Sequence, residues 1–360
     1  MSELGEFFTC EECVEEILKR LPSEVWKSGT KWFEPTCGDG KFIDSILNKS
    51  EGLEIHMTDI NKKNTDICKE KFKNNTNINI YCEDVLSQQL RGFDVIIGNP
   101  PFNTVKDSKL GKNKIYERIT IDCIKKLNPE GILAFIVPQN MFGGNSSKAY
   151  QYILENTHVI EIYFFSLKDR RKFFPTIQQP ICYFILKKTG TNNSKKTNIL
   201  PSDINIMLQN RPLNPVNEWT IHTENLVNKY ITIETNKSVY NRGYPINKYT
   251  GTKYPLVLSQ TKRLYTDDKE MARGYKIPKI IIFGISTCLS WMADLEGDYG
   301  VGPNTFYIPV VSENELKTLE IFFKSNECKK IIESTKTTRQ FMKISSIRNL
   351  NLQAILQHVV

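Results

Sequence analysis

The amino-acid sequence predicts an α/β protein, with a Rossmann-like, doubly wound and mostly parallel sheet first and a smaller domain after it. Three observations indicate this architecture. Short runs rich in Ile, Val and Phe recur up to residue 186, and helical stretches separate the early runs. The composition then turns polar over residues 187–198, which is typical of a linker or exposed loop. A chain of 360 residues is also long enough for about two domains.

Seven strands are expected in the first domain. Their ranges are 31–34, 53–58, 78–82, 93–98, 131–137, 159–165 and 181–186. Helices are expected between the early strands, for example at 42–47, 62–73 and 116–127. Alternation of strand and helix at this spacing favours parallel pairing. No long helix separates the last two strands, so we expect them to form a terminal antiparallel hairpin.

Another helix is expected near the start of the chain. Thr9 and Glu12 have the spacing of a capping box, and apolar residues follow at helical intervals. The second domain shows weaker periodicity, apart from a strand expected at 279–284 and a helix at 313–325. The predicted domains are residues 1–215 and 216–360.

Composition excludes several classes of protein. Apolar residues make up 40% of the chain and charged residues 24%, which is enough for a sizeable core and excludes wholesale disorder. No apolar run approaches the roughly 20 residues that a membrane-spanning helix needs. Residues 1–8 lack the pattern of a signal peptide, so we expect a soluble cytoplasmic protein with free thiols. Cys10 and Cys13 form only half of a zinc site, so no metal is expected.

Positive charge is concentrated in one segment of the second domain. The net charge of the chain is +8, and residues 229–279 carry 11 basic and only 4 acidic side chains. Tyrosines are interleaved with these cations, at positions 230, 240, 244, 249, 254, 265 and 275. Two interpretations are open on this basis: a solvated, loop-rich surface, or a groove that contacts the phosphates of a nucleic acid.

The loop after the first strand is the first candidate site, because ligands of doubly wound sheets bind at the carboxyl ends of the strands. It comprises residues 34–40, EPTCGDG, and leads into a helix. Gly38 and Gly40 would let the backbone approach a ligand closely. The pattern is neither a dinucleotide fingerprint nor a Walker loop, and for the glycines alone an ordinary tight turn is an equally good interpretation.

Acidic residues follow the next two strands. Asp59 lies about 20 residues after the glycines, a position from which a carboxylate can bind both ribose hydroxyls. Asp84 follows the third strand and could accept a hydrogen bond from an adenine amino group. Either residue alone could be a strand-end cap. Three suitable strand ends in succession favour a ligand that contains adenosine.

The fourth strand ends in Asn99-Pro100-Pro101-Phe102, whose chemistry suits an amine substrate. A conjugated amine is a poor nucleophile because its lone pair is delocalised. The side-chain oxygen of Asn99 and the carbonyl of Pro100 can each accept one of its N–H hydrogens, which directs the lone pair at an electrophile. The prolines fix the backbone, and Phe102 offers a face on which a planar base can stack. A rigid turn is the alternative interpretation of the prolines.

With these motifs in this order, the chain resembles the class I S-adenosylmethionine-dependent amino-methyltransferases. More closely, it is similar to the gamma-class, TaqI-like N(6)-adenine DNA methyltransferases of restriction-modification systems. The matching segments, over about residues 5–190, are 5–9, 34–40, Asp59, Asp84, 99–102, 114–116, 128–131, 137–138 and 173–175. Cys10 stands where that family usually has proline, and Phe102 where tyrosine is commoner.

The resemblance implies a seven-stranded methyltransferase sheet followed by an α+β target-recognition domain, and it assigns roles to particular residues. The implied catalytic residues are Asn99, Pro100, Pro101 and Phe102. The flipped base would stack between Phe102 and Phe174. Residues implied to bind S-adenosylmethionine are Thr9, Glu34, Pro35, Cys37, Gly38, Gly40, Asp59, Ile60, Asp84, Val85 and Asn99. Residues expected to contact DNA are Lys253, Lys262, Arg263, Arg273 and Lys276.

The function expected from the resemblance is sequence-specific methylation of adenine in double-stranded DNA, as the modification enzyme of a type II restriction-modification system. We expect a monomer that acts separately from any cognate endonuclease and binds no membrane. An RNA adenine methyltransferase is the main alternative, because Tyr, Lys and Arg suit single strands equally well. A protein glutamine methyltransferase and a catalytically inactive DNA-binding module are less favoured alternatives.

Overall fold

The structure is a computed structural model in which the chain forms two compact units, Met1–Pro212 and Leu213–Val360. The boundary predicted from composition lies three residues further along. The structure describes residues 9–102, 114–142, 147–177, 179–190, 195–208, 225–226, 229–230, 240–241, 249–283, 289–303, 305–335 and 350–358. Residues 5–8 of the predicted start motif, and Tyr244 of the basic segment, lie outside these ranges.

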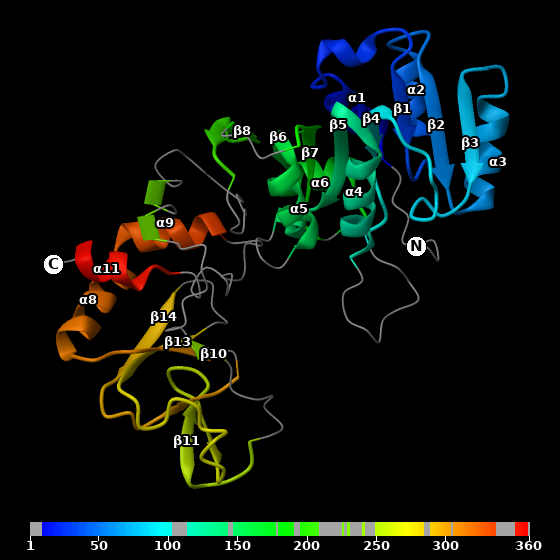
Figure 1. The fold of residues 1–360 in the computed structure, drawn as a ribbon. Coiled ribbons are helices and arrows are strands. Elements are labelled where there is room, and N and C mark those ends of the chain that lie inside the picture. Colours follow the sequence, from blue (N-terminus) through cyan, green and yellow to red (C-terminus); the bar gives the residue numbers. More distant parts are fainter. Residues whose placement is uncertain are drawn as a thin grey trace. The chain divides into compact units, whose positions relative to one another are not determined.

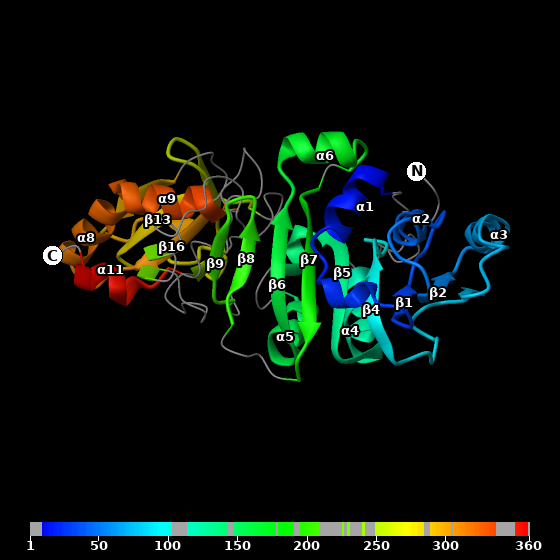
Figure 2. The same cartoon turned by 90° about the horizontal axis from the view of Figure 1, so that it is seen from above.

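The first unit is built on one sheet, whose strands appear in Figures 1 and 2. The strands are β1 (Lys31–Glu34), β2 (Glu54–Asp59), β3 (Ile78–Cys82), β4 (Phe93–Gly98), β5 (Leu127–Pro138), β6 (Thr157–Phe164), β7 (Ile181–Lys188), β8 (Thr197–Leu200) and β9 (Ile204–Ile206). Their spatial order is β3-β2-β1-β4-β5-β7-β6-β8-β9. Strands β1 to β5 pair parallel with one another, and β7 runs antiparallel between β5 and β6. The predicted doubly wound α/β fold with a terminal antiparallel strand is therefore confirmed.

The described sheet differs from the prediction in having nine strands instead of seven. The segment 187–198, predicted from composition to be a linker or exposed loop, includes the end of β7 and the start of β8, so at both of its ends that prediction is wrong. Strand β8 pairs parallel to β6 and antiparallel to β9. The hydroxyl of Thr197 donates to the carbonyl of Val159 at 2.7 Å, and Ile199 is buried. Apolar runs of two or three residues are too short to be recognised as strands, because their hydrophobic pattern cannot be separated from chance.

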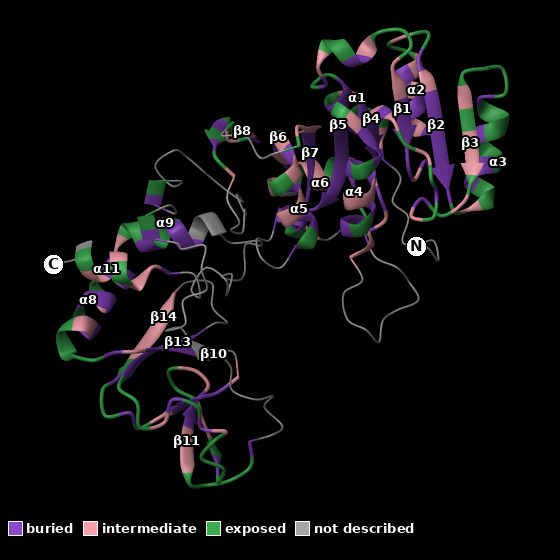
Figure 3. Ribbon diagram, in the orientation of Figure 1, coloured by how far each residue is buried: buried purple, intermediate pink, exposed green. Residues whose placement is uncertain are grey.

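Helices cover both faces of this sheet. They are α1 (Glu11–Leu18), α2 (Lys41–Leu47), α3 (Lys62–Lys71), α4 (Ile115–Lys126), α5 (Lys148–Asn156) and α6 (Leu167–Phe173). Helices α1 and α2 pack together on one face and α4 and α5 on the other (Figure 2). Figure 3 shows the central strands almost wholly buried between them, as expected for parallel strands covered on both sides.

The predicted capping box at the start of α1 is wrong. The helix begins one residue later than that pattern requires, with Cys10 as its N-cap and no side-chain capping hydrogen bond. Thr9 is buried, and its hydroxyl accepts a hydrogen bond from the side chain of Asn99 instead. A tertiary partner has therefore replaced the local one that the sequence spacing offers.

The second unit is an α+β structure made of two small sheets and a helical layer. One sheet has the order β10 (Tyr240–Asn241), β16 (Thr305–Pro309), β13 (Lys279–Phe283), β14 (Ser290–Asp294). The other has the order β12 (Arg263–Thr266), β11 (Tyr254–Val257), β15 (Gly300–Val301). The helices are α8 (Glu313–Lys324), α9 (Asn326–Thr335) and α11 (Leu352–His358).

Successive side chains of β13 belong to two different apolar clusters of the second unit. Ile280 and Ile282 belong to a cluster with apolar side chains of the helices, whereas Ile281 and Phe283 pack with residues of the smaller sheet. The period of two along a strand places successive side chains on opposite faces, so β13 is covered on both sides. Among the described residues, no helix combines the length and apolar character needed to cross a membrane.

Candidate active site

The sheet brings the predicted motifs together because β1 lies between β2 and β4. After β1 the chain adds β2 and β3 on one side of it, whereas β4 pairs with its other side. This reversal of strand order is the switch point, where ligands of doubly wound sheets bind. A Cβ placed on Gly98, the last residue of β4, would lie 3.6 Å from Cδ of Pro35 and 3.9 Å from Cγ of Glu34. The Asn-Pro-Pro-Phe segment therefore starts beside the glycine loop.

The glycine loop, residues 34–40, turns with two residues in the left-handed region. The φ angle is +52° at Gly38 and +75° at Gly40, which is the N-cap of α2. A Cβ on Gly40 would lie only 2.8 Å from Cε2 of Phe72 and 3.2 Å from Sγ of Cys68. Glycine is needed here for both its backbone conformation and its lack of a side chain. The loop is a tight turn packed against α3.

Asp59 connects the end of β2 to this loop. Its Oδ2 accepts a hydrogen bond from the backbone N–H of Gly38 at 2.9 Å, and its Oδ1 accepts from the N–H of Asn61 at 2.8 Å. These two bonds fix the carboxylate of Asp59 beside the glycine loop at the end of β2. Ile60 follows directly and is 64% exposed, an unusual degree for a large apolar side chain. A carboxylate and an apolar surface thus lie at adjacent positions.

Glu34 is a carboxyl group enclosed beside the loop. It is 2% exposed, and its Oε2 has no hydrogen-bond partner among the described residues. Burial raises its pKa well above the usual value, and the nearby groups of Cys68, Asp39 and Asp59 raise it further. A buried acceptor without a donor costs about 1–3 kcal/mol, so the site would be stabilised by a ligand that brings a donor or a positive charge.

Two thiols adjoin the same loop. Sγ of Cys37 lies 3.9 Å from Sγ of Cys68, and the Cys68 thiol donates to the carbonyl of Gly38 at 3.4 Å. The contact with Cys37 and the charge of Lys71 lower the pKa of Cys68, against the effect of burial. The sequence pattern singles out Cys37 but not Cys68, because Cys68 lies on α3 and carries no motif of its own.

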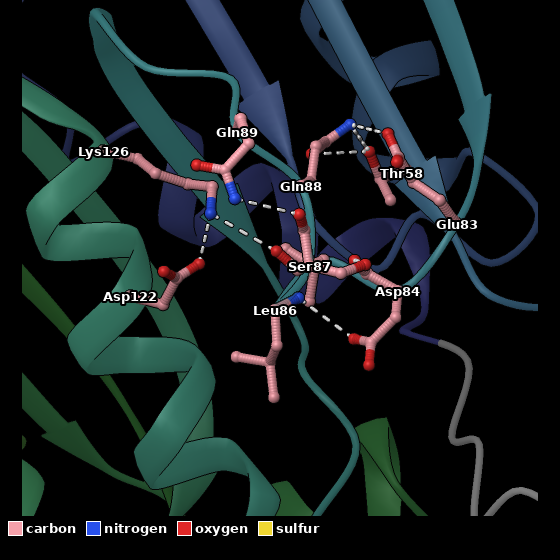
Figure 4. A network of polar contacts seen from close by, with 10 residues as sticks. Thr58, Glu83, Asp84, Leu86, Ser87, Gln88, Gln89, Asp122 and Lys126 are labelled. Atoms are coloured by element: carbon pink, nitrogen blue, oxygen red, sulfur yellow. Dashed lines mark hydrogen bonds and ion pairs between the residues drawn. The ribbon is translucent and has the colours of Figure 1, made fainter.

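The segment after β3 presents Asp84 and is held by a polar network (Figure 4). Asp84 is exposed, and its Oδ1 accepts from the N–H of Leu86 at 3.0 Å. The ammonium of Lys126, which is 1% exposed, donates to the carbonyl of Val85 at 3.3 Å and pairs with Asp122 on α4. This buried cation anchors the Asp84–Val85 backbone to the neighbouring helix.

Gln88 connects the same segment to β2. Its Nε2 donates to Oγ1 of Thr58 at 2.9 Å and to Oε1 of Glu83 at 2.6 Å, as Figure 4 shows. Thr58 in turn accepts the backbone N–H of Cys37 through its carbonyl, at 2.9 Å. The strand ends that carry the glycine loop, Asp59 and Asp84 are therefore joined by hydrogen bonds. Neither Gln88 nor Lys126 stands out in the sequence, since burial of one polar side chain leaves no local pattern.

The Asn-Pro-Pro-Phe segment is held at both ends. Nδ2 of Asn99 donates to Oγ1 of Thr9 at 3.2 Å, and Pro100 is buried. Phe102 is 2% exposed and meets the ring of Tyr116 edge-on, with centroids 6.5 Å apart. The hydroxyl of Tyr116 donates to Oδ1 of Asn140 at 2.7 Å, and burial raises its pKa, so it remains a donor at neutral pH.

Phe174, the second aromatic assigned to base stacking, lies just after α6. It is 3% exposed and packs edge-on against Phe165 at 5.6 Å between centroids. Phe102 and Phe174 belong to the same apolar cluster of the first unit. Both rings are therefore covered by protein in this structure. A planar base can stack on them only after side chains move.

The five cations assigned to DNA contact lie on the second unit and differ in their surroundings. Lys253, Lys262, Arg273 and Lys276 are exposed. Arg263 is only partly exposed, and its guanidinium donates to the carbonyls of Ser259 and Gln260, at 3.0 and 3.2 Å, and lies over the ring of Tyr299. The structure thus gives Arg263 interactions within its own unit. In the described part of the chain, no group of three or more His, Cys, Asp or Glu side chains is placed to hold a metal ion.

Comparison with known proteins decides the family resemblance. Residues 31–173 match the family model described as Eco57I restriction-modification methylase. The predicted resemblance to restriction-modification methyltransferases is confirmed. The matched range contains β1 to β6, and therefore the glycine loop, Asp59, Asp84 and the Asn-Pro-Pro-Phe segment.

Individual relatives cover part of the chain. Modification methylase CviBIII of Paramecium bursaria Chlorella virus NC1A is 28% identical over 52% of this chain and 51% of its own length. Ribosomal RNA small subunit methyltransferase C of Shewanella sediminis is 26% identical over 36% of this chain and 38% of its own length. The methyltransferase subunit of a type I restriction-modification system from Streptococcus thermophilus matches with 18% identity and a TM-score of 0.45, covering 57% of this chain and 51% of that one. The chain spans about half the length of the first of these relatives.

Proposed function

We propose that this protein transfers a methyl group from S-adenosylmethionine to the exocyclic amino group of adenine in double-stranded DNA, as the modification enzyme of a type II restriction-modification system. The observation that carries the proposal is the position of Asn99-Pro100-Pro101-Phe102 at the switch point of the sheet, beside the glycine loop. This segment lies inside the range that matches the restriction-modification methylases.

The residues at the three strand ends fit S-adenosylmethionine. Glu34 offers a buried carboxyl whose Oε2 is without a donor among the described residues, and a cationic group would satisfy it. Asp59 is a carboxylate at the end of the second strand, the position from which ribose hydroxyls are bound in such sheets, and exposed Ile60 offers an apolar face for the adenine ring. Asp84 is exposed and could accept from an adenine amino group. When bound, this cofactor supplies an electrophilic methyl group on a sulfonium.

Asn99 and Pro100 would hold the amino group of the target base. The side-chain oxygen of Asn99 and the backbone carbonyl of Pro100 each accept one N–H hydrogen, which leaves the lone pair directed out of the ring plane. The rigid Pro-Pro backbone keeps these acceptors in place before the base arrives, so little reorganisation is needed in the transition state.

The target base must leave the DNA helix to reach these acceptors. Phe102 and Phe174 are proposed to stack on it, and stacking of about 1–3 kcal/mol per base offsets much of the cost of unpairing. Because both rings are buried in this structure, base binding must be accompanied by displacement of side chains around them. We therefore propose that the aromatic clamp opens only with the base present.

The second unit is proposed to bind the DNA phosphates. Lys253, Lys262 and Arg273 are exposed on the unit that contains the β12-β11-β15 sheet, and Tyr265 nearby on β12 is 45% exposed. Replacing Lys253 and Lys262 with Ala should lower the slope of log affinity against log salt by about 1.8, if each lysine contacts one phosphate. Lys317→Ala is the control, because that exposed lysine pairs with Glu313 on α8. An unchanged slope in the double variant would contradict this part of the proposal.

RNA is the second candidate substrate, because the chain is similar over 36% of its length to ribosomal RNA small subunit methyltransferase C. The deciding experiment offers labelled S-adenosylmethionine with unmethylated genomic DNA or with total RNA, at equal phosphate concentration. The proposal predicts label in DNA, confined to adenine and to one sequence context. Label in RNA alone, or in cytosine, would refute it.

A further inference from the structure

We propose that Cys37 and Cys68 form a redox switch, in which a disulfide between them weakens binding of S-adenosylmethionine at the glycine loop and reduction restores it. This inference rests on the proposed cofactor site, and it is independent of whether the methyl acceptor is DNA or RNA. The two thiols come from different elements, because Cys37 lies in the glycine loop after β1 and Cys68 lies on α3.

The two sulfurs are close enough to be joined by a small movement. Sγ of Cys37 and Sγ of Cys68 are 3.9 Å apart, although the residues are 31 positions apart in the sequence. The sulfurs of a disulfide lie about 2.0 Å apart, so each would move by roughly 1 Å along the line between them. Both side chains are buried, at 3% and 0% exposed, so packing keeps the pair together.

The surroundings of Cys68 favour its thiolate, which is the nucleophile in disulfide formation. The ammonium of Lys71 donates to the carbonyl of Asp39 at 2.9 Å, which holds a positive charge beside the glycine loop. The contact with Cys37 and the charge of Lys71 lower the pKa of Cys68, against the effect of burial. We therefore assign the first attack on the oxidant to Cys68.

The oxidant that this reaction requires is a hydroperoxide such as hydrogen peroxide. The Cys68 thiolate attacks a peroxide oxygen, so that an S–O bond forms, the O–O bond breaks, and the departing hydroxide becomes water with the proton released by Cys68. The Cys37 sulfur then attacks the sulfur of Cys68. The S–S bond forms, the S–O bond breaks, and a second water leaves with the proton of Cys37. Two electrons pass from the two thiols to the peroxide. Because both sulfurs are buried, the peroxide reaches them during local opening of the loop.

The disulfide would alter the glycine loop at a contact that shapes it. The Cys68 thiol donates to the carbonyl of Gly38 at 3.4 Å, and the disulfide has no hydrogen to donate. The backbone N–H of Gly38 donates to Asp59, so a displacement of this residue also reaches the carboxylate proposed to bind ribose. A Cβ on Gly40 would lie 3.2 Å from Sγ of Cys68, which shows how closely the loop packs on this sulfur. Drawing the two sulfurs together therefore moves the loop from the conformation that we propose for the cofactor.

Titration calorimetry tests the switch on the full chain. The Kd for S-adenosylmethionine is measured in the reduced protein, after hydrogen peroxide, and after return to dithiothreitol. Two coupled events typically change each other's equilibria by about 5–150-fold, so we expect the Kd to rise about tenfold or more on oxidation and to recover on reduction. Peptide mass spectrometry should find the peptides of Cys37 and Cys68 linked. Because coupling is reciprocal, saturating S-adenosylmethionine should raise the reduction potential of this disulfide, by about 30 mV for a tenfold effect.

Two variants separate this pair from the other thiols. Cys68→Ala removes one sulfur of the pair, and Cys82→Ala removes the exposed thiol at the end of β3. Each variant is compared with its own reduced form, so a change in its basal affinity does not enter the result. The response to peroxide should be lost in Cys68→Ala and kept in Cys82→Ala. If Cys68→Ala fails to fold, Cys68→Ser takes its place, because serine is close to cysteine in size and cannot form the disulfide.

Several results would overturn the inference. They are the absence of the linked peptide, a linked peptide with an unchanged Kd, and the same response to peroxide in Cys68→Ala. A loss of affinity that dithiothreitol does not reverse would overturn it as well, because it indicates further oxidation of a single sulfur. If the reduced wild type binds no S-adenosylmethionine, the proposed function fails and the switch fails with it, and this result is distinct from every effect of oxidation.

Discussion

For Gly40→Ala, the structure defines both contributions to the loss of unfolding free energy, one from the backbone and one from packing. Gly40 has a φ of +75°, and an L residue in the left-handed region costs about 1–2 kcal/mol. The added methyl would lie 2.8 Å from Cε2 of Phe72 and 3.2 Å from Sγ of Cys68. Both neighbours are buried, at 5% and 0% exposed, so neither can swing into solvent to make room. Overpacking of this kind costs about 1–3 kcal/mol, which gives a total of about 2–5 kcal/mol.

Gly29→Ala isolates the steric part of this cost. Gly29 has a similar φ of +83°, but nothing lies within 4 Å of the position of its Cβ. It should lose only the backbone term of about 1–2 kcal/mol. The difference between the two variants, about 1–3 kcal/mol, is therefore the cost of the contact between the glycine loop and α3.

Hydrogen exchange of the most protected amides in β1 and β4, followed by mass spectrometry, measures this difference for the first unit alone. We expect these amides to exchange faster in Gly40→Ala than in Gly29→Ala, by the factor that corresponds to about 1–3 kcal/mol of unfolding free energy. We also expect a weaker Kd for S-adenosylmethionine in Gly40→Ala only, because Gly29 lies before β1 and outside the loop. Equal exchange in the two variants would refute the packing argument.

Three further predictions concern single groups of the first unit. Burial raises the folded-state pKa of Glu34, so its contribution to stability is complete below its ordinary pKa of 4.5 and is lost as the pH rises through the folded value. Glu34→Gln should remove this pH-dependent loss of stability, because glutamine does not ionise. The urea midpoint of the wild type should therefore fall between pH 4 and pH 7 by more than that of the variant. The same change in both proteins would contradict the prediction. Lys126→Met should lower the unfolding free energy by about 1–3 kcal/mol and weaken cofactor binding in calorimetry, because it leaves the carbonyl of Val85 without its donor. The control is Gln89→Ala at an exposed position, which should change the unfolding free energy by less than about 0.5 kcal/mol. Equal effects of the two substitutions would contradict the anchoring role of Lys126. Native-state labelling with iodoacetamide should modify exposed Cys82 well before Cys37 or Cys68, as peptide mass spectrometry would show, and early labelling of either buried thiol would contradict the packing of the loop.

The strands of the sheet were predictable where they are buried on both faces. Val95, Ile96 and Ile97 form an uninterrupted apolar run between turn residues, and the strand has the predicted bounds, 93–98. The last two strands of the sheet, β8 and β9, were not predictable, because four and three residues carry too little pattern. The antiparallel strand β7 was anticipated from the missing helix, although its place between β5 and β6 is a property of the whole sheet.

The part of the site that could be predicted is the set of motifs at the strand ends, because strand order and the chemistry of each motif are visible in the sequence. The motifs lie at the carboxyl ends of β1 to β4, and topology alone brings such ends to one edge of the sheet. The supporting contacts could not be predicted, because they join residues distant in sequence. Thr9 has the spacing of a helix cap but bonds Asn99, and Lys126 resembles any last-turn lysine but is buried at 1% exposure. In both cases a tertiary partner overrides the local pattern.

The most direct test of the central claim compares wild type with Asn99→Ala on unmethylated double-stranded DNA, with nucleosides identified by mass spectrometry. The wild type should produce N(6)-methyldeoxyadenosine. The variant should lose about 100-fold or more in rate, because an acceptor for the amino group is gone, while its Kd for S-adenosylmethionine stays nearly unchanged. Methylation at an undiminished rate in Asn99→Ala, or a methylated nucleoside other than N(6)-methyldeoxyadenosine, would contradict the account.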